Sequence, residues 1–155
     1  MDFRKKIVTE EQLPAWLASL RAVGKKNVVT NGCFDILHVG HVTYLEAARN
    51  EGDALLVGVT RDAWVGEIKG PGRPVNSEAD RAAVLAALES VDGVCIFADK
   101  TAVNFLECAK PDVYVKGGDY TLETINQEER RLMQAFFQPI LPGSRPLSAK
   151  PSKIG

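Results

Sequence analysis

The chain has 155 residues, of which 45% are hydrophobic and 25% charged, a length and composition typical of one globular domain. Nineteen basic and twenty acidic residues leave a net charge of −1, which provides no overall field for holding a nucleic-acid backbone or an anionic membrane surface. Without a signal-peptide pattern, a membrane-span pattern or a CxxC pair among its three cysteines, the sequence predicts a cytoplasmic protein with reduced thiols and no nucleic-acid or membrane partner.

The first part of the chain alternates helix and strand patterns. Residues 9–12 (TEEQ) have the form of a capping box and precede a helix that Gly24 would end. The segment 27–30 (NVVT) predicts a short strand, and 39–50 (VGHVTYLEAARN) predicts a helix. Residues 54–60 (ALLVGVT) are apolar throughout, as in a parallel strand with helices on both faces of its sheet.

The second part continues the alternation after an irregular segment. Residues 61–76 (RDAWVGEIKGPGRPVN) are polar and contain glycine and proline, which predicts a long active-site loop. The elements expected after it are a helix over 77–90, a strand over 93–97, a helix over 101–110, a strand over 112–116 and a helix over 123–138. Pro139 then disfavours a regular final strand. The alternation predicts an α/β fold with right-handed βαβ units and ligands at the carboxyl ends of the strands.

Both histidines of the chain lie in one short segment, 30–41 (TNGCFDILHVGH), between the first strand and the next helix. Unpaired amides and the positive end of the helix dipole meet at such a junction, which favours an anion. Glycines at 32 and 40 allow backbone and ligand to approach closely, and His38 and His41 are spaced to donate to one phosphate from one face of the helix start. The segment therefore indicates a phosphate site.

The segment admits two other interpretations. His38 and His41 could share a zinc ion with Asp35 as third ligand, although no HExxH pattern is present. Cys33 could act as a nucleophile beside the histidines, but a cysteine next to Phe34 in such a turn is more often a packing residue. Phosphate binding remains the favoured interpretation.

The pattern Gly-x-Phe-Asp-x-x-His-x-Gly-His at 32–41 resembles the signature of the cytidylyltransferase-like nucleotidyltransferases. Together with 68–81 (IKGPGRPVNSEADR), 88–94 (LESVDGV) and 111–120 (PDVYVKGGDY), it resembles the heptose 1-phosphate adenylyltransferases. The resemblance implies a Rossmann-like, doubly wound sheet of mainly parallel strands with flanking helices, the HUP-type nucleotidyltransferase fold. We expect a single, stand-alone nucleotidyltransferase domain over 1–155, with 1–25 as a leading helical segment and 142–155 as an atypical tail.

The resemblance also implies a reaction and a set of residues. The enzyme would transfer AMP from ATP to a sugar 1-phosphate, with Mg²⁺ on the triphosphate, release pyrophosphate and supply an ADP-sugar for a lipopolysaccharide; many relatives are homodimers, so we expect one here. The implied catalytic residues are His38, His41 and Lys69, and Asp35 would bind or position the sugar phosphate. The implied nucleotide-binding residues are Asn31, Gly32, Cys33, Phe34, Gly40, Arg81, Lys116, Gly117, Gly118, Asp119 and Ser148. No side chain is expected to bind a metal.

Several assignments stay open on the residues alone. Lys69 could be a solvated loop lysine, and Gly117 and Gly118 could serve only to permit positive φ. Arg81 could reach a phosphate or pair with Glu78 or Asp80 on a solvated face, and Arg73 is similar.

The substrate and the turnover are also open. A CTP-dependent enzyme acting on a polyol or amino-alcohol phosphate fits the same motifs. The family usually ends in a basic residue, Ser-Thr-Thr and a helix, whereas this chain reads SRPLSAKPSKIG at 144–155, where prolines disfavour a helix. Ser148 is the best match to that motif, and Ser144, Arg145, Lys150 and Ser152 could replace its contacts. A nucleotide-binding module without turnover is therefore a further alternative.

Overall fold

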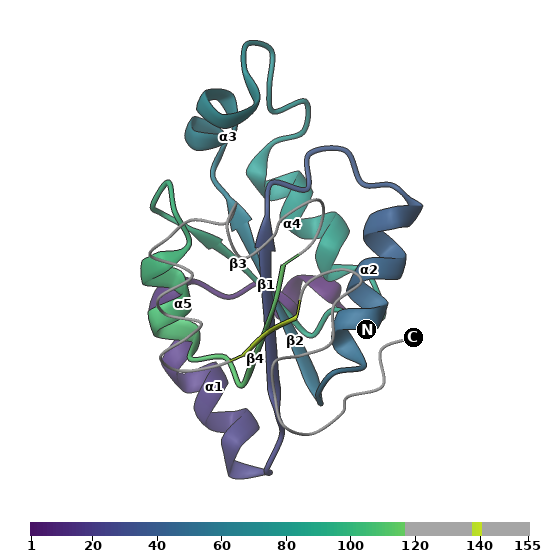
Figure 1. Ribbon diagram of the computed structural model, residues 1–155, viewed down its shortest axis with the longest axis vertical. Coiled ribbons are helices and arrows are strands. Elements are labelled where there is room, and N and C mark those ends of the chain that lie inside the picture. The colour runs from purple at the N-terminus through teal and green to yellow at the C-terminus, as the bar shows by residue number, and fades with distance from the viewer. Residues whose placement is uncertain (117–137, 141–155) are drawn as a thin grey trace.

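A five-stranded parallel sheet forms the centre of the part of the chain that the computed structural model describes, residues 1–116 and 138–140. The strands lie in the order β3-β2-β1-β4-β5, and every neighbouring pair is parallel (Figure 1). Their bounds are β1 Asn27–Gly32, β2 Ala54–Thr60, β3 Gly93–Phe97, β4 Val113–Val115 and β5 Gln138–Ile140. The predicted α/β class is confirmed.

Helices cover both faces of this sheet (Figure 1). The helical segments are η1 Phe3–Lys6, η2 Glu10–Gln12, α1 Leu13–Ala22, α2 Val39–Arg49, α3 Asp62–Lys69, α4 Glu78–Ala86 and α5 Val103–Ala109. Leu45 of α2 and Leu85 of α4 pack with Val28 on one face, whereas Phe105 of α5 packs with Val29 on the other. Because each such side chain contributes about 1.5–3 kcal/mol when fully buried, the two cores hold the helices on the sheet.

The predicted elements are found with small shifts at their ends, and two predictions were wrong. Within the expected loop 61–76, residues 62–69 form helix α3, because Val65 is buried and the Trp64 indole donates to the Ala98 carbonyl over 2.8 Å. Pro139 does not prevent a final strand, since β5 is three residues long and pairs within the described residues only with β4. The helix expected over 123–138 lies outside the described residues except for its last position.

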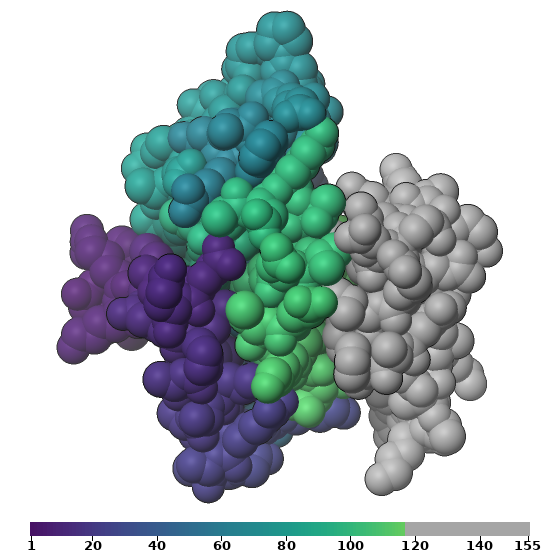
Figure 2. All heavy atoms as spheres, turned by 90° about the vertical axis from the view of Figure 1, so that its left-hand side faces the viewer, coloured from purple at the N-terminus to yellow at the C-terminus, as the bar shows by residue number. Residues whose placement is uncertain are grey.

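The strand order creates a switch point between β1 and β4. From β1 the chain moves across the sheet to β2 and β3, whereas β4 and β5 lie on the other side of β1. In open α/β sheets, ligands bind in the crevice at the carboxyl ends of such strands. Helix α3 and the residues after it extend at this same end of the molecule, as Figures 1 and 2 show. None of the helices in the described part of the chain has the length and apolarity to cross a lipid bilayer.

Candidate active site

Two interlocked imidazoles begin helix α2. His38 is the N-cap residue, and its Nδ1 accepts a hydrogen bond of 3.0 Å from the Gly40 amide. The His38 amide in turn donates to Nδ1 of His41 over 3.2 Å, and the ring centroids are 3.9 Å apart. A neutral imidazole whose Nδ1 accepts carries its proton on Nε2. Both rings are therefore held in the form that offers an Nε2–H donor to a ligand.

Ring packing also explains the glycines of the motif. A Cβ on Gly40 would lie 2.8 Å from Cε1 of His38, and one on Gly32 would lie 3.0 Å from the Phe34 ring. Phe34 has a φ of 48°, a value uncommon for a side-chain-bearing residue, and its ring meets His41 edge to face at 5.6 Å. The Gly-x-Phe and x-Gly-His patterns are thus required by the packing of these rings.

Lys69, the last residue of α3, acts electrostatically on the histidine pair. Burial lowers the pKa of His41 below its ordinary value of 6.5, and electrostatic repulsion of a protonated His41 by the neighbouring His38 and Lys69 lowers this pKa further. Lys69 on α3 is distant in sequence from His38 and His41 at the start of α2, yet the three residues predicted to be catalytic share one electrostatic environment. At neutral pH, His41 is an uncharged donor beside a cation.

Asp35 holds the loop before α4. Its carboxylate is 2% exposed and accepts hydrogen bonds from Nε of Arg73 at 2.5 Å and from the amides of Val75 and Asn76 at 2.9 and 3.0 Å. Burial alone would raise the pKa of Asp35, but the amides of Asn76 and Val75 and the Arg73 side chain lower it to about 2. Since these partners already occupy the carboxylate, the geometry favours positioning over direct contact with the sugar phosphate.

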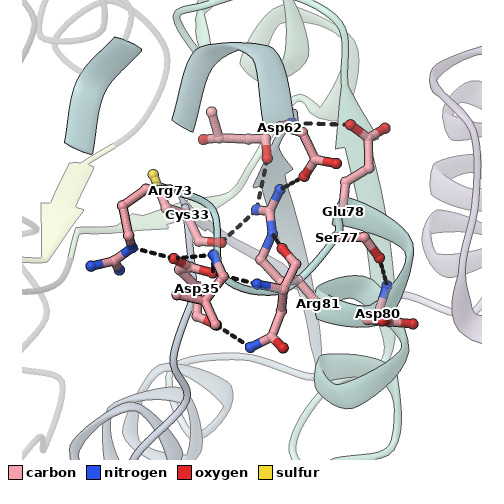
Figure 3. A network of polar contacts seen from close by, with 11 residues as sticks. Cys33, Asp35, Asp62, Arg73, Ser77, Glu78, Asp80 and Arg81 are labelled. Carbon is pink, nitrogen blue, oxygen red and sulfur yellow. Dashed lines mark hydrogen bonds and ion pairs between the residues drawn. The ribbon is translucent and has the colours of Figure 1, made fainter. Parts of the chain in front are cut away.

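A buried arginine joins the strand ends beneath the site (Figure 3). Arg81 is 2% exposed, and its Nη1 donates to the carbonyls of Cys33 and Thr60 at 2.7 and 2.8 Å. Its Nε donates to the Asn76 carbonyl at 3.0 Å, and its Nη2 pairs with Asp62 at 2.7 Å. A single guanidinium thus ties together the ends of β1 and β2, the start of α3 and the loop before α4. We call Arg81 and these acceptors, with Asp35 and Arg73, the arginine frame.

Of the two alternatives left open for Arg81, the pairing with Glu78 or Asp80 on a solvated face was wrong. Glu78 instead accepts from the Asp62 amide at 3.0 Å, and the Asp80 amide donates to Ser77, which caps α4 (Figure 3). The strand-end carbonyls are acceptors that need a buried donor, and Arg81 supplies it. Its direct contact with a nucleotide stays a prediction, while the observed bonds favour a positioning role.

Tyrosine hydroxyls link β1 to β4 at the switch point. Tyr114 of β4 donates to Oδ1 of Asn31 near the end of β1. On the other face, the Tyr44 hydroxyl lies 2.5 Å from Oγ1 of Thr30 and donates to the Val115 carbonyl at 3.1 Å. Lys116, 7% exposed, directly follows β4. Asn31 and Lys116, both predicted to bind the nucleotide, therefore lie at the carboxyl ends of adjacent strands.

The zinc interpretation is contradicted. Among the described residues, no three His, Cys, Asp or Glu side chains gather as a metal site. The Asp35 carboxylate faces Arg73 and two amides, and Nδ1 of each histidine accepts from an amide.

The remaining predicted nucleotide contacts lie partly inside and partly outside the described residues. Cys33 offers its carbonyl to Arg81, and its side chain is partly exposed. Gly117, Gly118, Asp119 and Ser148 lie outside the described residues.

Sequence reasoning missed Asp62 and Tyr114. A signal for Asp62 existed, since it is an acidic residue two positions after a buried strand that ends in the predicted crevice. Tyr114 lies within an apolar strand pattern and looked like an ordinary core residue, so nothing local indicated that its hydroxyl would reach Asn31.

Comparisons with known proteins agree with this architecture. The sequence profile described as cytidylyltransferase-like matches residues 29–140. The chain is 56% identical over 115 residues to the bifunctional protein HldE of Pseudomonas fluorescens (strain Pf0-1), covering 74% of the chain and 24% of that protein. It is 51% identical over 120 residues to the HldE of Methylobacillus flagellatus, covering 77% and 25%. The chain thus spans about a quarter of the length of these curated relatives.

Two solved structures share the fold. The lipopolysaccharide core biosynthesis protein from Thermoplasma volcanium GSS1 superposes with a TM-score of 0.64 at 26% identity, covering 76% of this chain and 96% of that one. A pantoate-beta-alanine ligase from Francisella tularensis gives 0.58 at 17% identity, covering 92% and 70%, and shows the fold alone. With the sequence profile and the HldE relatives, these findings confirm the resemblance drawn from the motifs. The chain therefore belongs to the cytidylyltransferase-like family of nucleotidyltransferases.

Proposed function

We propose that the chain is an adenylyltransferase domain that transfers AMP from ATP to heptose 1-phosphate, giving an ADP-sugar and pyrophosphate. The observation that carries this proposal is the histidine pair at the start of α2, with both Nε2–H donors available and Lys69 close enough to lower the pKa of His41. Two neutral donors, a cation and a helix N-terminus at one strand end suit a polyphosphate better than any uncharged ligand.

The reaction needs positioning and charge stabilisation more than a protein nucleophile. An oxygen of the sugar phosphate attacks the α-phosphorus of ATP, and the bond to pyrophosphate breaks on the opposite side. Negative charge grows on the oxygens around the α-phosphorus, where His38, His41 and Lys69 would donate. Removing one such donor typically slows a reaction by a hundredfold or more.

Magnesium would enter as part of the Mg·ATP co-substrate. The described residues gather no three side chains able to hold a metal, and the Asp35 carboxylate already accepts from Arg73 and two amides. The ion would therefore bind the triphosphate oxygens, where it supplies charge neutralisation.

The choice of sugar phosphate rests on the relatives. Several HldE proteins match at 51–57% identity, and a solved relative is titled a lipopolysaccharide core biosynthesis protein. We propose on this basis a heptose 1-phosphate substrate, with Asn31, Gly32, Cys33, Phe34, Gly40 and Lys116 around the nucleotide and Asp35 and Arg81 as positioning residues. Gly117, Gly118, Asp119 and Ser148 are proposed nucleotide contacts from the motifs alone. A single nucleotidyltransferase domain over 1–155 and a homodimer are part of the same proposal.

The test is Mg²⁺-dependent pyrophosphate release, with ATP or CTP and with or without heptose 1-phosphate. Release only with ATP and the sugar phosphate, and its loss in His41→Ala, is the expected result. Release with CTP and a polyol or amino-alcohol phosphate would keep the mechanism and overturn the substrate. Nucleotide binding without release from any pair would overturn the enzymatic proposal and favour a binding module.

A further inference from the structure

Side-chain hydrogen bonds join the carboxyl ends of β1 and β4, where the fold predicts a ligand crevice. The backbone register pairs Val28 with Val113 and Val29 with Tyr114, whereas β1 continues to Gly32. Beyond the register, the two strands are joined by the Tyr114–Asn31 hydrogen bond on the face covered by α1 and α5. At the switch point, a side-chain hydrogen bond therefore sets the orientation of a polar group at the strand ends.

Asn31 is the residue whose orientation this contact decides. The Tyr114 side chain is fully buried among the residues of that core, and its hydroxyl donates to Oδ1 of Asn31, which is only partly buried. A carboxamide has an acceptor oxygen on one side and an NH₂ group with two donors on the other. With Oδ1 turned to the buried hydroxyl, the NH₂ group is turned away from the core, beside the Gly32 turn.

The direction of this carboxamide matters for an anionic ligand. An NH₂ group facing the crevice can donate to an oxygen of a nucleotide, whereas a carbonyl oxygen in that place would repel phosphate oxygens. Asparagine alone does not choose between the two, because a half-turn about its last side-chain bond exchanges oxygen and nitrogen. In this structure the Tyr114 hydroxyl donates to Oδ1, and this hydrogen bond selects the orientation in which the NH₂ group lies on the other side.

We propose that Tyr114 is a positioning residue for nucleotide binding, whose hydroxyl holds the Asn31 carboxamide with its NH₂ group toward an oxygen of the nucleotide. This inference rests on the proposed function, since it assigns a nucleotide to the crevice, and it adds a residue that never touches the ligand. Asn31 is the contact, and Tyr114 acts through it.

Tyr44 provides a matched control. Its hydroxyl also joins β1 to β4 at the same level, but on the opposite face, and its partners are the Thr30 hydroxyl and the main-chain carbonyl of Val115. Tyr44→Phe and Tyr114→Phe each delete one oxygen from one tyrosine beneath the crevice. Only Tyr114→Phe removes the donor that orients Asn31.

The experiment measures ATP affinity by calorimetry in the full chain, together with kcat and KM for ATP. We expect Tyr114→Phe to raise Kd and KM for ATP about tenfold, the size of one well-placed hydrogen bond, with a smaller change in kcat. Tyr44→Phe should leave the ATP Kd within about twofold. Asn31→Ala should weaken binding as Tyr114→Phe does, and adding Tyr114→Phe to Asn31→Ala should have no further effect.

Four results would overturn the inference. Additive losses in the Tyr114→Phe, Asn31→Ala pair would show that the tyrosine acts independently of the asparagine. Equal losses in Tyr44→Phe and Tyr114→Phe would indicate general loosening of the two strands. Full ATP binding in Asn31→Ala, with loss of binding in His41→Ala, would remove Asn31 from the site while leaving the proposed function in place. No binding of ATP or CTP by the unmodified chain would overturn both this inference and the proposed function.

Discussion

The arginine frame and the histidine pair contact the same turn. They differ in whether their polar groups are bonded within the protein or left for a ligand. In the frame, Arg81 is buried and four of its hydrogen bonds end on acceptors drawn from four segments of the chain. In the pair, His38 is exposed, and within the described residues Nδ1 is the ring atom of each histidine that accepts a hydrogen bond. The comparison teaches that the frame fixes the geometry of the turn, whereas the pair keeps donors available for a ligand.

Replacing Arg81 by methionine should have the largest effect on stability. Arg81→Met leaves the Cys33, Thr60 and Asn76 carbonyls and the Asp62 carboxylate without their donor, and breaking such a buried network costs about 3–5 kcal/mol. Urea denaturation measures this loss. The exposed Arg61, just before α3, is a matched control, and Arg61→Met should change the free energy of unfolding by less than about 0.5 kcal/mol. A loss below about 1 kcal/mol in Arg81→Met would show that the frame is not structural.

Replacing His38 by asparagine should abolish most activity without loss of stability. Asparagine is among the best N-cap residues, so His38→Asn retains a cap on α2 while it removes an imidazole donor. Pyrophosphate release should fall about a hundredfold, and the midpoint of thermal unfolding should stay close to that of the unmodified chain. His38→Ala, which removes cap and donor together, should lose about 1 kcal/mol of stability in addition. Near-normal turnover in His38→Asn would mean that His38 serves only as a cap.

Adding one methyl group at Gly40 should give a smaller loss. A Cβ there would lie 2.8 Å from the His38 ring, so the ring must move and its donor is displaced. We expect Gly40→Ala to lower kcat/KM about tenfold, while α2 is not weakened, because alanine favours helices more than glycine does. Steady-state kinetics and thermal unfolding test this together. Unchanged kinetics would show that the ring can shift without consequence for the ligand.

The smallest expected effect is a change in the pKa of His41. Lys69 lowers this pKa by its positive charge, so Lys69→Met should raise it, because the protonated imidazole loses a repulsive neighbour. The chain has two histidines, so NMR titration of their ring protons resolves the change. Lys100 is the control, because it pairs with Glu67, which lies on the same helix as Lys69. Lys100→Met should leave the pKa of His41 unaltered. No shift in Lys69→Met would separate α3 from the histidine pair.

Structure that depends on local sequence patterns was predicted correctly, whereas structure that depends on contacts between distant residues was missed. The apolar stretch 54–60 and the histidine turn are local patterns, and both were found where they were predicted. Helix α3 was missed because Gly66 and the Gly70–Gly72 segment indicate a loop, while its support comes from distant residues such as Ala98 and Arg81. The role of Arg81 was missed for the same reason, since main-chain carbonyls such as those of Cys33 and Thr60 leave no side-chain pattern to recognise.

The frame also has a consequence for how the protein responds to acid and base. A guanidinium stays protonated throughout the biological range, and Asp35, with its pKa lowered to about 2, stays ionised. The stabilisation from Asp35 is fully present above the ordinary pKa of a carboxyl near 4, and it is lost only as the pH falls toward 2. Between pH 5 and 8 the support beneath the site is electrically constant. Any variation of catalysis in that interval would therefore arise at the imidazoles or at the substrates' own phosphates.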